Sequence, residues 1–164
     1  MASAYLIWLL FIAVYDFRQR RVPNWLVLAG ALLAVAALAL GAAPIEQQWN
    51  AALLGAGLAF GVLLLFYASG VMGAGDVKFA GALGLWIGSS ALLPVWLLAS
   101  LLASLHAALW LVLGRWPLFP RLSLALFGPP AGGNPPPKRV RFIPYAAYLA
   151  LAAAVWMVWG RQSG

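Results

Sequence analysis

The chain has 164 residues, of which 65% are hydrophobic and only 8% are charged. A soluble globular domain carries about 25% charged residues, so this composition excludes an ordinary water-soluble fold and predicts an integral membrane protein. The formal net charge is +7, but the basic residues lie between apolar runs without interleaved aromatic residues, so we expect no nucleic-acid binding. The chain has no cysteine, which excludes disulfides, thiolate metal sites and a cysteine nucleophile.

Six apolar runs predict the architecture, which is an all-α, polytopic transmembrane bundle of about six spans in a single domain, residues 1–164. The runs cover residues 2–17, 25–43, 51–72, 77–87, 92–113 and 142–159. Because a helix needs about 20 apolar residues to cross a bilayer, the first and fourth spans are short, and a polar helix end can then lie at membrane depth. The first run has its basic cluster after it, in the reverse order of a cleavable signal, so we expect a retained span.

The basic residues predict the orientation of these spans. With six spans, the connections after the first, third and fifth lie on one side of the membrane and carry nine of the ten basic residues: Arg18, Arg20, Arg21, Lys78, Arg115, Arg121, Lys138, Arg139 and Arg141. The positive-inside rule places these connections in the cytoplasm and both termini outside it. The longest connection, residues 114–141, holds seven of the eleven prolines. It is either a linker or a cytoplasmic flap whose stretch 121–127 lies on the membrane surface.

The chain has only three carboxylates, Asp16, Glu46 and Asp76. Glu46 lies in a non-cytoplasmic loop, where a solvated acid is expected. Asp16 closes the first span and Asp76 opens the fourth, so both meet the cytoplasmic side. Asp16 can be an interfacial acid neutralised by Arg18 or Arg20, and Asp76 can be a helix N-cap after the flexible turn 73–75.

Two neighbouring carboxylates also have a chemistry of their own. They cannot both ionise easily, so they share a proton and titrate as a unit. One can then take a proton from water while the other donates to a substrate carbonyl, and peptide bonds are the usual target. Asp16 and Asp76 are therefore candidates for an aspartic hydrolase.

Two segments around these aspartates resemble known signatures. Residues 16–24 read DFRQRRVPN and residues 73–79 read GAGDVKF. They resemble the two motifs of the type IV prepilin peptidases, an aspartate followed by a basic stretch and Ile/Val-Pro-Asn, and GxGDxK. Residues 143–148, IPYAAY, resemble the Pro-aromatic start of the family's last span, with Pro144 shaping the site. The resemblance covers nearly the whole chain.

The resemblance implies a membrane-embedded aspartic endopeptidase of the bacterial inner membrane, with Asp16 and Asp76 as the catalytic pair. It implies cleavage of a short, basic leader from prepilin or pseudopilin precursors at the cytoplasmic face, commonly after a glycine. Membrane lipid and other pilus-assembly or secretion components are the further partners. No cofactor and no metal are expected, because one histidine and separated acids do not supply the usual three or four ligands. Which aspartate acts as base stays open.

The neighbours of the aspartates have predicted roles in shaping the site. Gly73 and Gly75 let an extended substrate backbone approach without steric conflict. Pro23 ends the loop after the first span, so that Asn24 can cap the second. Lys78 either favours the ionised aspartate and binds substrate carbonyls or sets the topology at a span end.

The chain differs from the larger members of that family. They carry a cytoplasmic insertion with paired cysteines and a methyltransferase activity, whereas this chain has no cysteine and Pro23 follows Asp16 by seven positions. We therefore expect no N-methyltransferase activity and a likeness to the short, peptidase-only branch associated with Flp/Tad-type pili. The basic cluster Arg18, Arg20 and Arg21 would repel a basic leader, so we assign it to lipid phosphates.

Two other functions are open to the sequence. A transporter or proton channel would use Asp16 and Asp76 as carriers, but that class usually places ionisable groups near the bilayer midplane. A non-enzymatic pilus-assembly protein would use small-residue faces, such as residues 55–57 and Gly61, for helix packing, and both aspartates would then tolerate replacement by asparagine. His106, inside the fifth span, is a packing residue or a proton relay.

Overall fold

The computed structural model describes residues 1–43, 45, 48–115 and 144–160. These residues form helices and connecting turns, without a strand among them, which confirms the all-α prediction. The helices are α1 (Ala2–Gln19), α2 (Asn24–Ala39), α3 (Trp49–Ala68), α4 (Ala74–Arg115) and α6 (Tyr145–Gly160). Glu46, Arg161 and the part of the proline-rich connection beyond Arg115 lie outside the described residues.

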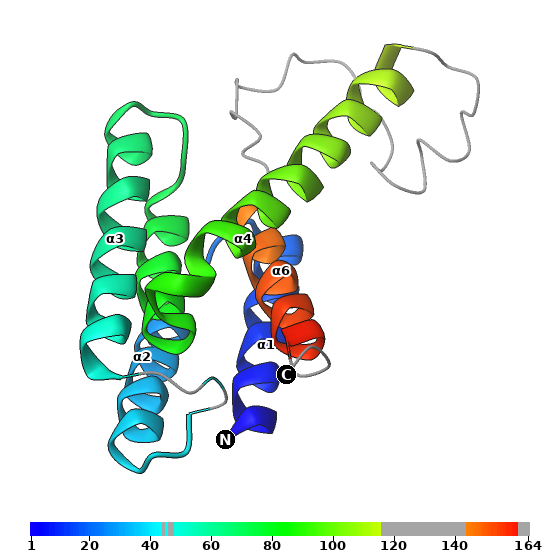
Figure 1. Cartoon of the computed structure of the whole chain (residues 1–164). Coiled ribbons are helices and arrows are strands. Elements are labelled where there is room, and N and C mark those ends of the chain that lie inside the picture. Colours follow the sequence, from blue (N-terminus) through cyan, green and yellow to red (C-terminus); the bar gives the residue numbers. More distant parts are fainter. Residues whose placement is uncertain (44, 46–47, 116–143, 161–164) are drawn as a thin grey trace.

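A single glycine divides α4 into two helical segments. Gly88 has φ 66° and ψ −177°, a backbone conformation that glycine adopts without steric cost. The break falls where the fourth and fifth predicted spans meet, and Figure 1 shows the segments before and after it running in different directions. The apolar runs 77–87 and 92–113 leave residues 88–91 as a connection between two spans. In the structure only Gly88 has non-helical angles, so residues 89–91 are helical and that expected connection is too long.

Glycines also end α2 and α3 earlier than the apolar runs predict. Gly41 and Gly70 both have positive φ, and the N–H of the residue after each donates to a carbonyl five positions back, from Ala42 to Ala37 and from Val71 to Phe66. This pattern is the Schellman helix end. The predicted ends at residues 43 and 72 are therefore too late, since the run of apolar residues continues past the turn.

The order of the helices in space brings the end of α1 beside the start of α6. In Figure 1, α1 and α6 lie side by side and run in opposite directions, so the N-terminus and the end of α6 lie at one end of the molecule. α1 contacts α6 and α2, and α4 contacts α2, α3 and α6. This agrees with a common side for both ends of the bundle, while the assignment of that side stays a prediction.

Two buried indoles hold α1, α2 and α4 together. Trp8 Nε1 donates to the Leu26 carbonyl at 2.8 Å, and Trp86 Nε1 donates to the Gly30 carbonyl at 3.0 Å. A Cβ at Gly30 would overlap the Trp8 ring, so only glycine fits there. The helices that carry the two aspartates are thus fixed against the same face of α2.

The backbones of α3 and α4 touch directly. A Cβ on Gly55 would lie within 3 Å of backbone atoms of Gly84 and Gly88, and a Cβ on Gly84 would lie within 3 Å of the Gly55 backbone. Small residues at helix contacts are characteristic of membrane bundles, because they let backbones approach closely.

The outward faces of the bundle are apolar. Large side chains such as Leu10, Leu28, Leu65 and Leu101 are more than half exposed. By length and composition, Trp49–Ala68 and Ala74–Val112 could each cross a membrane, and only 17% of either apolar window is buried. The core helix of a soluble protein would be mostly buried, so these faces suit lipid. The count of six spans stays a prediction.

Candidate active site

Asp16 lies on the last turn of α1 and is 4% exposed, the one buried charged residue in the described part of the chain. The helix ends three residues later at Gln19, because Arg20 adopts the left-handed conformation with φ 51° and its N–H donates to the Asp16 carbonyl at 2.8 Å. This tight turn directs the following residues toward the start of α4, where Val22 is buried. The end of α1 therefore presents its carboxylate inward.

Asp76 lies in the first turn of α4 and is half-buried. Its Oδ2 accepts from the N–H of Gly73 at 3.2 Å, which is how an acid at the third helical position satisfies the residue before the helix. Asp76 is therefore not the N-cap residue that the sequence suggests. Gly73 occupies the cap position, and Asp76, three residues later, accepts a hydrogen bond from it. A Cβ on Gly73 would lie 3.3 Å from Asp76 Oδ2, so glycine leaves space for the carboxylate.

The first turn of α6 joins the two aspartates. The N–H of Ala146 donates to Asp76 Oδ1 at 2.9 Å, and the N–H of Ala147 donates to Asp16 Oδ2 at 2.9 Å. These N–H groups have no intrahelical acceptor in a first turn, and the N-terminal end of a helix favours negative charge. Two carboxylates from separate helices thus converge on consecutive backbone donors.

Pro144 and Tyr145 precede these donors and fix the start of α6. Pro144 is buried, and proline is well suited to a helix start because it has no N–H to satisfy. The Tyr145 hydroxyl lies 3.1 Å from Ser100 Oγ of α4 in a hydrogen bond. The start of α6 is therefore attached to α4 by a side chain as well as by Asp76.

The next turn of α6 packs between α1 and α4. The Tyr148 ring meets Phe17 edge-on, with ring centroids 5.7 Å apart, and lies 5.8 Å from the His106 ring. This contact is consistent with the packing role considered for His106.

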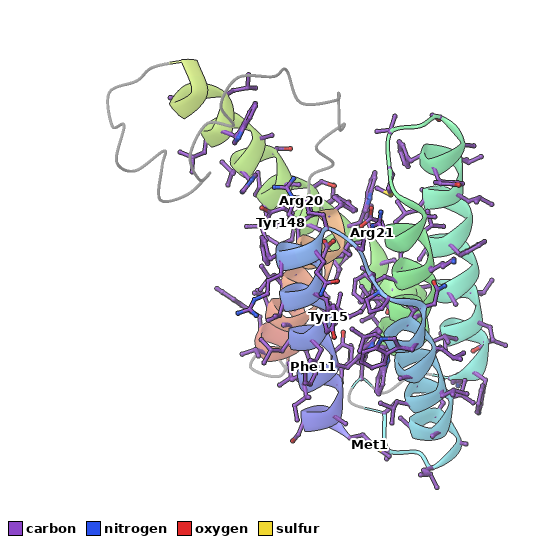
Figure 2. The ribbon with its side chains drawn as sticks, turned by 180° about the vertical axis from the view of Figure 1, so that it is seen from behind. Met1, Phe11, Tyr15, Arg20, Arg21 and Tyr148 are labelled. Atoms are coloured by element: carbon purple, nitrogen blue, oxygen red, sulfur yellow. The ribbon has the colours of Figure 1, made fainter. Side chains whose placement is uncertain are left out.

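A cavity of about 230 Å³ lies beside the carboxylates. It is lined by Asp16, Arg20, Arg21, Val22, Gly73, Ala74, Gly75 and Asp76. Figure 2 shows Arg20 and Arg21 at the end of α1 away from Met1. The two carboxylates interact electrostatically, and Arg20 interacts with Asp16. Two acids placed in this way can activate a water molecule. Among the described residues, no group of three acidic or histidine side chains could hold a metal ion.

Lys78 and Asn24 lie together but outside this cavity. Lys78 Nζ donates to Asn24 Oδ1 at 3.1 Å, and both residues line a different groove between α2, α3 and α4. Asn24 does not cap α2 as predicted: Pro23 occupies the cap position, with extended angles, and no side chain caps the helix. The Lys78–Asn24 bond instead links the starts of α4 and α2.

The sequence pattern singles out both aspartates and the glycines before Asp76 as candidates, but it does not indicate other residues that lie beside them. The backbone donors at Ala146 and Ala147 carry no side-chain signal, although the Pro-aromatic segment before them indicated the right helix. The basic cluster predicts contacts with lipid phosphates for Arg20 and Arg21, and the structure places both in the lining of the cavity.

Comparison with protein-family models matches residues 3–114 to the type IV leader peptidase family. The match covers more than half of the chain and includes both aspartates with their motifs. Helix α6 lies after the matched residues. No curated protein and no solved structure matches the chain.

Proposed function

Because the chain belongs to the type IV leader peptidase family, we propose that it is a membrane-embedded aspartic endopeptidase with Asp16 and Asp76 as its catalytic pair. Its substrates are prepilin or pseudopilin precursors, from which it removes the N-terminal leader. The family match supports the protease class, and the aspartic mechanism is inferred from the site.

The observation that carries this proposal is the convergence of both carboxylates on the first turn of α6. Asp16 and Asp76 are 60 positions apart in the chain, yet they bind the adjacent N–H groups of Ala147 and Ala146 and line one cavity. Each acid alone could be an interfacial charge or part of a helix cap. Neither of those roles requires the two carboxylates to bind adjacent donors and to line one cavity.

The geometry suits a shared-proton mechanism. One aspartate, ionised, takes a proton from water as the water oxygen bonds to the peptide carbonyl carbon, and the protonated aspartate gives its proton to the carbonyl oxygen. The proton on the first aspartate then passes to the peptide nitrogen as the C–N bond breaks, and the second aspartate regains its proton from the new acid. The α6 donors hold both carboxylates in place throughout, which lowers the cost of orientation.

The neighbouring residues support this chemistry without touching the reacting atoms. Gly73 leaves room for the Asp76 carboxylate, and Gly75 lies beside Val22, where an added Cβ would be in ordinary contact with the Val22 nitrogen at 3.4 Å. Lys78 and Asn24 keep α4 and α2 in register. Pro144 fixes the beginning of α6.

The site acts at the cytoplasmic face of the bacterial inner membrane. The charge distribution of the connections supports that side, and the lack of cysteine supports a peptidase without N-methyltransferase activity, like the short branch associated with Flp/Tad-type pili. Membrane lipid and pilus-assembly components are its other partners.

Co-expression with a candidate prepilin from the same genome tests this function, with leader removal scored by gel shift and N-terminal sequencing. We expect Asp16→Asn and Asp76→Asn to abolish cleavage while Glu46→Gln, at the third carboxylate, remains active at equal membrane abundance. Full cleavage by either aspartate variant would reject the aspartic mechanism. Pilus assembly that survives both substitutions, without leader removal by the wild type, would favour the non-enzymatic assembly role.

A further inference from the structure

Two arginines line the same cavity as the two carboxylates. Arg20 and Arg21 follow α1 directly and are exposed. They line the cavity of about 230 Å³ together with Asp16, Asp76 and the glycine turn 73–75. In Figure 2 both lie at the end of α1 that carries the site. An arginine that only sets membrane topology has no need to line a cavity, whereas Arg18, two positions earlier, is exposed and lines none of it.

The backbone at Arg20 indicates that its side chain is used. Arg20 is the one non-glycine residue with positive φ among the described residues. After α2 and α3 the left-handed conformation is taken by Gly41 and Gly70, the residue type that meets no steric cost there. A strained residue retained where glycine would be easier points to a functional side chain.

Arg20 interacts with Asp16, and the cavity as a whole has a net positive charge when the aspartate pair holds one proton. The two guanidiniums carry two positive charges, and an aspartate pair that shares one proton carries one negative charge. A single carboxylate from outside would neutralise the site. Guanidinium groups bind carboxylates through paired, charge-assisted hydrogen bonds.

We propose that Arg20 and Arg21 form a substrate subsite that binds one aspartate or glutamate side chain of the peptide, a few residues from the cleaved bond. This inference rests on the proposed peptidase function. The subsite rejects lysine and arginine at that position by like-charge repulsion, so it fixes the direction in which the peptide lies across Asp16 and Asp76. It also replaces the assignment of these two arginines to lipid phosphates.

Peptides that span the leader junction of a prepilin from the same genome test the subsite with the purified, full-length enzyme. Each acidic residue is replaced by its amide and kcat/KM is measured. At one position we expect a loss of about ten- to a hundredfold, the usual scale for a hydrogen bond to a charged group. Arg21→Gln should cause a similar loss on the acidic peptide and no further loss on the amide peptide.

Charge exchange and a matched control complete the test. Arg21→Glu should cleave a peptide with lysine at the selected position better than the acidic peptide, while Arg18→Gln should keep the wild-type preference. If no carboxylate matters, or if Arg18→Gln and Arg21→Gln have equal effects, the subsite is rejected and contacts with lipid phosphate explain the arginines.

Binding to the Asp16→Asn and Asp76→Asn proteins separates this proposal from the peptidase function. Both should bind the acidic peptide about ten- to a hundredfold more tightly than its amide form, without cleavage. The same preference in a wild-type protein that never cleaves would reject the peptidase and keep the subsite. Cleavage by the wild type with equal binding of both peptides would reject the subsite alone.

Discussion

At the residue scale, the two aspartates owe their positions to backbone donors. Asp76 accepts from Gly73 and Ala146, and Asp16 accepts from Ala147. The sequence could single out the aspartates, since carboxylates are rare in so apolar a chain and costly near a membrane. It could not single out the alanines, because a backbone N–H has no side-chain signature and its partners are 70 and 131 positions away.

The space beside the Asp76 carboxylate is a first test at this scale. Gly73→Ala would place a Cβ 3.3 Å from Oδ2 and press the carboxylate out of position. We expect kcat to fall about tenfold, because a misplacement of about 1 Å can cost about a hundredfold. Gly57→Ala is the control, since a Cβ there meets nothing within 4 Å. Equal activity of both variants would show that Asp76 does not need this space.

The dependence of the rate on pH tests the sharing of the proton. At low pH both Asp16 and Asp76 are protonated and no base is available, and at high pH both are ionised and no acid is available. Single-turnover cleavage by the purified enzyme should therefore rise and then fall between about pH 4 and about pH 9. A rate that is constant over that range would contradict the mechanism.

At the element scale, α6 links α1 and α4 through hydrogen bonds at its first turn. Its first turn binds one aspartate from each, and Tyr145 adds a bond to Ser100 of α4. The apolar runs predicted that this helix and the break in α4 exist. They could not predict the Gly88 turn as a single residue or the helix ends at Gly41 and Gly70, since backbone torsion rather than hydropathy decides those points.

Removal of one backbone donor tests whether these hydrogen bonds from α6 are needed for cleavage. Ala147→Pro removes the N–H that donates a hydrogen bond to Asp16. Because Ala147 lies in the first turn of α6, the substitution removes no hydrogen bond within the helix. We expect cleavage to fall about ten- to a hundredfold, whereas Ala147→Gly, which keeps the N–H, should stay within about threefold of wild type. Thermal unfolding in detergent checks that α6 still forms. A folded Ala147→Pro enzyme with full activity would exclude a role for this donor.

At the scale of the whole molecule, the two aspartates lie where α1 ends and α4 begins, and Figure 1 shows that this end of α1 is the one away from the N-terminus. The outward faces of the described helices are apolar. Composition was sufficient to predict this class of fold. Composition does not predict which helices pack together, because long-range helix contacts depend on residue shape, as between Trp8 of α1 and Gly30 of α2.

Topology reporters test the orientation of the bundle. Alkaline phosphatase is active only outside the cytoplasm, so fusions at Gln48 and after Gly160 should be active and fusions at Gly70 and Arg115 inactive. The positive-inside rule is the physical reason. The opposite pattern would place Asp16 and Asp76 on the non-cytoplasmic side and contradict the proposed site of cleavage.

The most direct test of the account is a comparison of Asp16→Asn, Asp76→Asn and the double variant by single-turnover cleavage of one prepilin peptide, with equal amounts of folded enzyme. If the two carboxylates act as one catalytic unit, each single variant loses as much activity as the double variant, because the loss of either group disables the pair. Substantial cleavage by one single variant, with losses that simply multiply in the double variant, would show two independent residues and contradict the shared-proton pair.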